Sequence, residues 1–237
     1  EVEVMTGWLS LLTAPGDLPE VWGLPKVAGV LVEGPSGCGK SEIVAAAAEA
    51  VGTNVKEVSL ELVFKPQKLL ELLEKAVNDP ARPTVIFLDR LDAVVGDDAL
   101  FRNQVAAIMR WFLDAVAERP RMACVLGVSS VARLPEAVAK SAFLPRTLSI
   151  PPPDLQRRAL LFEAALARVP SDEIDFSVLA ARTAGFSGAD VLAAVVHASA
   201  LVAQDGGEVT EALLIRALEE TTPSLGTASL GEVPSYG

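Results

Sequence analysis

The feature that most restricts the fold of this chain is a glycine-rich loop between a strand-like run and a helix-like run. The loop, residues 34–41, reads G-P-S-G-C-G-K-S; it follows an apolar run ending at Glu33 and precedes an Ala-rich stretch. Glycines at these spacings let the backbone turn successive N–H groups inward, where they and the start of the next helix form a nest for phosphate oxygens. The strand-loop-helix context predicts an α/β fold.

The loop also carries the residue types that hold a nucleoside triphosphate and its magnesium ion. Lys40 is expected to neutralise the β- and γ-phosphates, and Ser41 to offer its hydroxyl to Mg²⁺. The alternative is a glycine-rich turn with a solvated lysine, but a chance match in this context is rare. We therefore predict that ATP or ADP binds here with Mg²⁺. The expected binding residues are Gly34, Pro35, Ser36, Gly37, Cys38, Gly39, Lys40 and Ser41.

From residue 27 onward, short apolar runs alternate with helix-period segments, which is the pattern of a parallel sheet flanked by helices. The expected strands are 27–33, 54–60, 84–89, 122–129 and 147–150. The expected helices between them are 40–51, 67–77 and 100–117. This pattern predicts a five-stranded parallel sheet of the P-loop NTPase type, doubly wound with helices on both faces.

The pattern changes at residues 151–154, P-P-P-D, because three prolines cannot continue a central strand or a helix. The Ala-rich amphipathic stretches that follow predict a small α-helical lid: 155–168, 176–183, 188–203 and 210–220. The tail is rich in Ser, Gly, Thr and Pro and predicts a linker or a free end. The expected organisation is a leading segment at 1–26, a nucleotide-binding subdomain at 27–153, the lid at 154–222 and a linker at 223–237.

Composition excludes several classes of partner. A formal net charge of −11 and the lack of a basic stripe argue against nucleic acid, whose binding depends on clustered Lys and Arg. No apolar run reaches the roughly eighteen residues of a membrane-spanning helix. The two cysteines, Cys38 and Cys124, have no disulfide or metal-ligand spacing, and the chain begins with acidic residues. We therefore expect a cytoplasmic protein.

A second acidic position follows the predicted strand 84–89. The run V-I-F-L-D ends in Asp89, the arrangement of a carboxylate that holds the hydration shell of Mg²⁺ opposite a phosphate loop. Any buried strand can end in Asp at a turn, so this pattern gains its meaning from the loop that precedes it. Together with Ser41, Asp89 is the candidate metal residue.

At this point the sequence resembles the AAA family, in particular the first module of tandem-ring members similar to the valosin-containing protein. In that family the strand ends Asp-Glu and continues Ile-Asp-Ala, whereas here the text is D-R-L-D-A from residue 89. The glutamate that would polarise the attacking water is replaced by Arg90. A guanidinium cannot accept a proton, and a positioned base contributes about 10²- to 10⁴-fold in rate. The resemblance therefore implies impaired hydrolysis, with Asp92 the nearby residue that could replace the base.

The lid carries a second family signature. Residues 185–191 read G-F-S-G-A-D-V and resemble the lid motif of AAA proteins, in which Gly188 and Ala189 would let adenine and ribose approach closely. The same text is also a good helix start, with Ser187 as N-cap and Asp190 closing a capping box. Both interpretations can hold together.

Other family positions are partly changed. The polar sensor after the fourth strand, normally Asn, aligns with Ser130, and of two arginine-finger positions only Arg146 is retained, because the other is Phe143. The pore loop usually has an aromatic residue and a glycine, but here it keeps only Phe64. The resemblance implies a hexameric ring in which Arg146 reaches the nucleotide of a neighbouring subunit, with a protein substrate or adaptor as further partner.

Three functional interpretations follow. The leading one is an ATP-binding module of a tandem-ring, protein-remodelling ATPase with impaired hydrolysis in this module; the tail resembles the linker to a second module. A second is a fully active motor that uses Asp92 or another base, and a third is a non-catalytic scaffold that binds no nucleotide. The intact phosphate loop argues against the scaffold. Arg90, Ser130 and Phe143 argue against the active motor.

Overall fold

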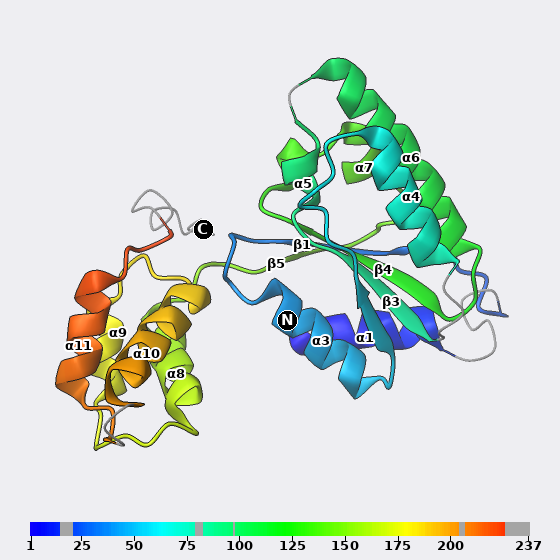
Figure 1. The fold of residues 1–237 in the computed structure, drawn as a ribbon. Helices are drawn as coiled ribbons and strands as arrows, with labels where there is room; N and C mark the ends of the chain where they lie inside the picture. Colours follow the sequence, from blue (N-terminus) through cyan, green and yellow to red (C-terminus); the bar gives the residue numbers. More distant parts are fainter. Residues whose placement is uncertain (15–20, 79–82, 97, 204–206, 226–237) are drawn as a thin grey trace, which may run out of the picture. The chain divides into compact units, whose positions relative to one another are not determined.

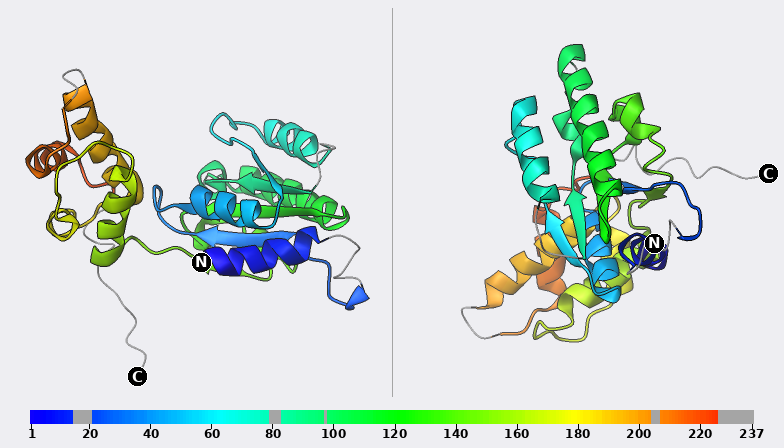
Figure 2. Two further views of the ribbon diagram at one scale, coloured as in Figure 1. Left: turned by 90° about the horizontal axis from the view of Figure 1, so that it is seen from below. Right: turned by 90° about the vertical axis from the view of Figure 1, so that its right-hand side faces the viewer.

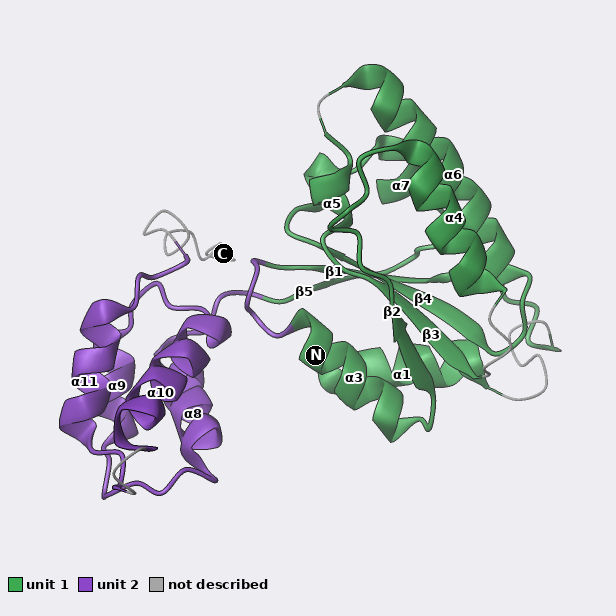
Figure 3. Cartoon of the chain, in the orientation of Figure 1, with its two compact units in different colours: residues 1–34, 40–150 green, residues 35–39, 151–237 purple. Residues whose placement is uncertain are grey.

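The computed structural model describes residues 1–14, 21–78, 83–96, 98–203 and 207–225 (Figure 1). The chain divides into two compact units (Figure 3). The first, here called the sheet unit, comprises Glu1–Gly34 and Lys40–Ile150; the second, the helical unit, comprises Pro35–Gly39 and Pro151–Gly237. The division therefore passes through the phosphate loop. Most of the predicted linker, residues 226–237, lies outside the described residues.

The sheet unit is built on parallel strands in the order β2-β3-β4-β1-β5. Their bounds are β1 Gly29–Glu33, β2 Asn54–Glu57, β3 Thr84–Leu88, β4 Met122–Val128 and β5 Thr147–Ser149. Strands β1, β3 and β4 are rich in Val, Leu and Ile and almost wholly buried, as expected for a parallel sheet covered on both faces. The five-stranded parallel sheet predicted from the sequence is confirmed, with somewhat shorter strands.

Helices cover both faces of the sheet, which confirms the doubly wound arrangement (Figures 1 and 2). One face carries α1 Val2–Thr13 and α3 Lys40–Ala50. The other carries α4 Pro66–Val77, α5 Leu91–Val94, α6 Ala99–Ala117 and α7 Glu136–Ala139, with a short 3₁₀ turn, η1, at Val131–Arg133.

Helix α1 lies in the predicted leading segment 1–26, where no helix was expected. Its buried residues include Met5 and Leu9, which are spaced by four and face α3 and the sheet. Glu1, at the N-cap position, makes no side-chain capping bond, so the sequence lacks the usual start signal. Tertiary packing of one apolar face is therefore what holds this helix.

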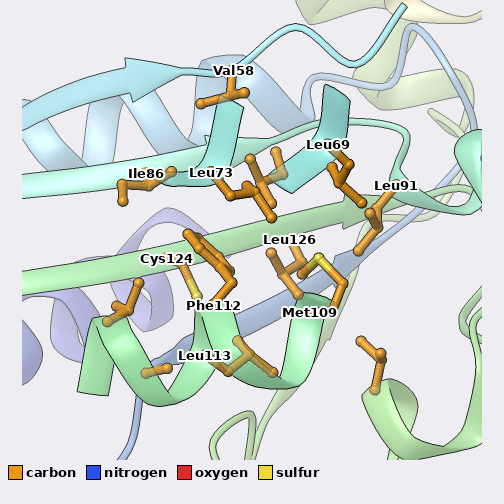
Figure 4. Close-up of a cluster of buried hydrophobic side chains, with 14 of the residues drawn as sticks. Val58, Leu69, Leu73, Ile86, Leu91, Met109, Phe112, Leu113, Cys124 and Leu126 are labelled. Atoms are coloured by element: carbon orange, nitrogen blue, oxygen red, sulfur yellow. The ribbon is translucent and has the colours of Figure 1, made fainter. Parts of the chain in front are cut away.

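The main core lies between the sheet and helices α4 and α6 (Figure 4). Leu73 of α4 and Met109 and Phe112 of α6 are fully buried against Ile86 of β3 and Leu126 of β4. Burying each such side chain contributes about 1.5–3 kcal/mol. The core thus fixes the carboxyl ends of strands β3 and β4, which Asp89 and Ser129 directly follow.

The helical unit contains α8 Leu155–Leu166, α9 Phe176–Arg182, α10 Gly188–Ala203 and α11 Glu211–Glu220. Helix α8 begins directly after the proline run 151–153. Asp154 caps this helix by accepting a hydrogen bond of 2.8 Å from the Arg157 amide. Phe162, Leu179 and Leu214 are fully buried within this unit. The predicted helical region after the sheet is confirmed. Among the described residues, no helix has the length and apolarity required to span a membrane.

Candidate functional site

The two ends of the phosphate loop, Gly34 and Lys40 with Ser41, belong to the sheet unit. The Gly34 amide donates to the carbonyl of Val128 at 3.1 Å, and a Cβ at position 34 would lie 2.4 Å from the carbonyl oxygen of Ile150. Only glycine therefore fits where β1 leaves the sheet. Lys40 opens α3, is buried, and donates from Nζ to the Gly34 carbonyl at 2.9 Å. The ammonium is held within the loop, which argues against the solvated alternative.

The backbone of the loop has the conformation that the sequence predicts. Gly37 and Gly39 have φ values of 75° and 87°, in the left-handed region that side-chain-bearing residues rarely adopt. Helix α3 begins directly afterwards at Lys40, so its free N–H groups and positive dipole end lie at the loop. This combination favours a bound anion such as a phosphate group.

Residues 35–39 group with the helical unit, and there they contact the lid signature. The Ala189 amide donates to the Gly37 carbonyl at 3.1 Å. A Cβ at position 37 would lie 2.8 Å from Ser187 Oγ, and a Cβ at position 188 would lie 3.1 Å from the Gly37 carbonyl oxygen. The structure therefore brings together two motifs that lie some 150 residues apart in the sequence. Small residues are required at this contact.

The start of α10 forms the predicted capping box. The Ser187 amide donates to Asp190 Oδ2 at 2.7 Å, and the Asp190 amide donates to Ser187 Oγ at 3.3 Å. The same carboxylate oxygen accepts from the amide and the hydroxyl of Ser224, at 3.0 and 2.7 Å. Burial works to raise the pKa of Asp190, but these hydrogen bonds outweigh it and hold the pKa below its ordinary value. The first residues after α11 are thereby attached to the lid signature.

Asp89, the predicted metal residue, directly follows β3. Its Oδ1 atom is fully buried and, among the described residues, has no hydrogen-bond partner. A buried carboxylate oxygen without a partner is costly unless a ligand or ion satisfies it. The hydroxyl of Ser41, at the start of α3, and the Asp89 carboxylate are both oxygen donors of the kind that suit Mg²⁺ and its hydration shell. These residues therefore fit the predicted cation.

Arg90 has an unusual backbone conformation and an ion-pair partner. Its φ and ψ are 53° and 39°, the left-handed region, and its exposed guanidinium binds Glu61 Oε1 at 2.5 Å. Both residues line a cleft of about 630 Å³ between α5 and the segment after β2, which Asp89 and Phe64 also line. The position directly after Asp89 thus presents a permanent cation in this cleft.

Asp92 is the residue near Arg90 that could replace the missing base. It is buried, and its Oδ1 accepts from the Ser129 amide at 3.0 Å while its Oδ2 accepts from the Ser129 hydroxyl. Arg133 Nη1 lies 3.8 Å from the same Oδ2. Both carboxylate oxygens are therefore occupied by structural contacts, which argues against Asp92 as a base that activates water.

Two polar residues near the strand ends were missed by sequence reasoning. Ser129, the residue before the predicted sensor Ser130, makes the contacts to Asp92, while Ser130 is half-buried and makes no side-chain capping bond to the turn that follows. Glu33, the last residue of β1, accepts at Oε1 from the Val131 amide at 2.8 Å. A polar residue at the end of a buried strand was the available signal in both cases.

A family model described as "ATPase family associated with various cellular activities (AAA)" matches residues 30–150, which include the phosphate loop, Asp89 and Arg146. The match covers just over half of the chain. The chain belongs to the AAA family. The AAA assignment made from the phosphate loop and the lid signature is thus confirmed.

Relatives of this AAA chain include ATPase family gene 2 protein homolog B of Bos taurus, at 27% identity over 88% of this chain and 30% of the relative. Proteasome-activating nucleotidase 2 of Halobacterium salinarum is 30% identical over 90% of this chain and 56% of the relative. The cell division cycle protein 48 homolog of Archaeoglobus fulgidus is 28% identical over 81% of this chain and 28% of the relative. A solved structure from work on katanin self-assembly shares the fold, with a TM-score of 0.72, 24% identity and coverage of 96% of this chain and 84% of that one. The chain spans about a third of the length of the ATPase family gene 2 relative.

Phe143 and Arg146, the two residues predicted at arginine-finger positions, have different surroundings. Phe143 is half-buried and packs against the main core, and its carbonyl accepts from the amides of Ala28 and Gly29. Arg146 has an exposed side chain, whereas its carbonyl accepts from the Leu31 amide at 2.9 Å. The Arg146 side chain is therefore presented to solvent from a backbone fixed beside β1.

Proposed function

We propose that this AAA module binds ATP and ADP with Mg²⁺ and hydrolyses ATP only slowly. Its buried Lys40, the left-handed glycines of the loop and the unsatisfied oxygen of Asp89 support nucleotide and cation binding. The observation that carries the second part is Arg90, which occupies the position directly after Asp89 and is held by Glu61.

Each residue has a distinct role in this proposal. The loop amides and Lys40 bind the phosphates, while Ser41 and Asp89 hold Mg²⁺ and its water. Mg²⁺, when bound, would neutralise negative charge that develops on the phosphate oxygens. Gly188 and Ala189 line the lid side, where the contact with Gly37 already requires small residues.

Slow hydrolysis follows from the missing base. Loss of a positioned base removes about 10²- to 10⁴-fold in rate, or about 3–5 kcal/mol of barrier stabilisation. Arg90 has no acceptor atom, and Asp92 directs both oxygens to Ser129. Nucleotide binding uses other residues and is retained.

In the whole protein, we propose that the module serves assembly and regulation of a hexameric ring, while a second ATPase module drives remodelling of a protein substrate. Arg146 would act on the nucleotide of the adjacent subunit. Its exposure and the lack of a side-chain partner among the described residues support this role.

Phosphate release at saturating ATP tests the proposal. Wild type should stay near the uncatalysed background, and Arg90→Glu combined with Glu61→Gln, which avoids a new like-charge pair, should raise the rate about tenfold or more. Arg90→Gln with Glu61→Gln is the matched control, because it removes the cation without adding a base. A rapid wild-type rate, or equal rates for the two double variants, would contradict the assignment of Arg90.

A further inference from the structure

The order of the strands sets a problem for Asp89. Strand β4 lies between β3, which Asp89 follows, and β1, which leads into the phosphate loop. The carboxylate must therefore pass across β4 to serve a cation held at that loop. Leu88 of β3 is paired with Leu126 of β4, so the next position on β4, opposite Asp89, is Gly127.

Gly127 has no room for a side chain, and the atoms that fill its space belong chiefly to Asp89. A Cβ at position 127 would lie 2.5 Å from Asp89 Oδ1 and 3.3 Å from Asp89 Cα. It would also lie 3.3 Å from the Phe87 ring, which limits the space further. The carboxylate oxygen nearest to Gly127, Oδ1, is the same one that is buried without a hydrogen-bond partner in the described part of the chain.

The rest of β4 offers no other reason for a glycine. Every residue of the strand is buried, and the others carry apolar side chains or Cys124. The backbone φ of Gly127 is not positive, so no left-handed turn demands it. Glycine inside a strand weakens it and often marks the close approach of another group.

We infer that Gly127 is the positioning residue for Asp89, because its bare backbone lets the carboxylate cross β4 and present Oδ1 to Mg²⁺. A methyl group at position 127 would push the carboxylate away from this path. The contact itself is independent of any ligand, whereas its consequence for Mg²⁺ rests on the proposed function.

The first experiment measures affinity for AMP-PNP with Mg²⁺ and with EDTA by calorimetry. Wild type should bind AMP-PNP at least about tenfold more tightly with Mg²⁺ than with EDTA. Gly127→Ala and Asp89→Asn should each lose most of this Mg²⁺-dependent gain, while their affinity in EDTA stays unchanged. Gly7→Ala is the control, since a Cβ there meets nothing within 4 Å. A Gly127→Ala ratio equal to wild type would overturn the inference.

The second experiment is a ligand-free double-mutant cycle of thermal unfolding with Asp89→Ala, Gly127→Ala and the double variant. Gly127→Ala should lower Tm in wild type by several degrees and by less than half as much in the Asp89→Ala background, where the crowded carboxylate is gone. Equal losses in both backgrounds would overturn the contact. If Gly127→Ala alone does not fold, the inference requires that the double variant folds, because the crowding carboxylate is absent from it. A double variant that also fails to fold would overturn the inference. Wild type that binds no nucleotide would contradict the proposed function, while this cycle would still decide the role of Gly127.

Discussion

Lys40 shows how a single residue can report on a ligand site. An ammonium group is rarely buried without a strong reason, and here it is buried with the Gly34 carbonyl as one acceptor. An ammonium held at the start of α3 is placed to attract an anion, and charge-assisted hydrogen bonds to phosphate oxygens are stronger than neutral ones.

We expect Lys40→Ala to weaken ATP binding at least about tenfold, because a charge-assisted contact contributes about 1.5–3 kcal/mol and tenfold corresponds to about 1.4 kcal/mol. Calorimetric titration of ATP measures the change. Lys140→Ala is a suitable control, since Lys140 forms an exposed pair with Glu136 and should leave affinity unchanged. Equal affinity in Lys40→Ala and wild type would remove the phosphate-loop assignment.

Asp92 is expected to matter for stability and not for turnover. Asp92→Ala leaves the Ser129 amide and hydroxyl without their acceptor and should cost about 1–3 kcal/mol of unfolding free energy, measured by urea denaturation. Asp92→Asn should leave the slow rate of phosphate release unchanged in protein that remains folded. A substantial wild-type rate that Asp92→Asn abolishes would instead support an active motor.

At the scale of elements, the start of α10 joins two parts of the helical unit. Its first turn contacts Gly37 of the phosphate loop through Ala189, and Asp190 binds Ser224, which follows α11. Leu225 adds a hydrogen bond from its amide to the Gly185 carbonyl and is buried. A single helix end thus organises both the loop and the beginning of the tail.

The stabilising contribution of Asp190 should depend on pH. Its pKa is lower in the folded chain than the ordinary 3.8, so its contribution is complete above 3.8 and is lost as pH falls through the folded-state pKa. Asp190→Asn should cost about 0.5–2 kcal/mol at neutral pH, as loss of a capping carboxylate does. Thermal unfolding from pH 7 down to pH 3 measures the difference from wild type, which should shrink only below 3.8. Ser224→Ala is the control: it removes the hydroxyl contacts to Asp190 and Ser187 and keeps the hydrogen bond from the Ser224 amide to Asp190. A difference between Asp190→Asn and wild type that does not change with pH would refute the linkage.

At the scale of the molecule, the net charge and the residues at the two predicted finger positions bear on the expected assembly. The net charge of −11 opposes association of copies over a range of about 8–10 Å at moderate salt. Phe143 packs against the core of its own chain, so in the proposed ring Arg146 is the arginine that would act across a subunit boundary.

We expect the isolated chain to be monomeric or weakly associated at micromolar concentration, with ATP and higher salt each promoting assembly. Multi-angle light scattering with and without ATP at two salt concentrations measures this. Arg146→Ala should weaken ATP-dependent assembly, while the exposed Arg110→Ala on α6 should not. A stable hexamer without nucleotide would contradict the expectation, and an Arg146→Ala chain that assembles normally would exclude the finger role.

Local patterns in the sequence were sufficient for the strands, the main helices and the phosphate loop. Each depends on residues close together in the chain: alternating apolar runs, glycines at fixed spacing and a capping box such as Ser187 with Asp190. Arg90 could be identified in the same way, because it directly follows Asp89 at the position where the family has glutamate.

Tertiary structure alone decided the contacts between distant segments. Asp92 lies 37 positions from Ser129, and whether it is a base or a structural acceptor depends on how β3 and β4 pair. Helix α1 lacks a capping signal and exists through its packing on α3 and the sheet. Gly127 looked like any small residue in a buried strand, and only strand order shows that Asp89 must cross it, because hydrogen bonds between parallel strands bring together residues that no local pattern connects.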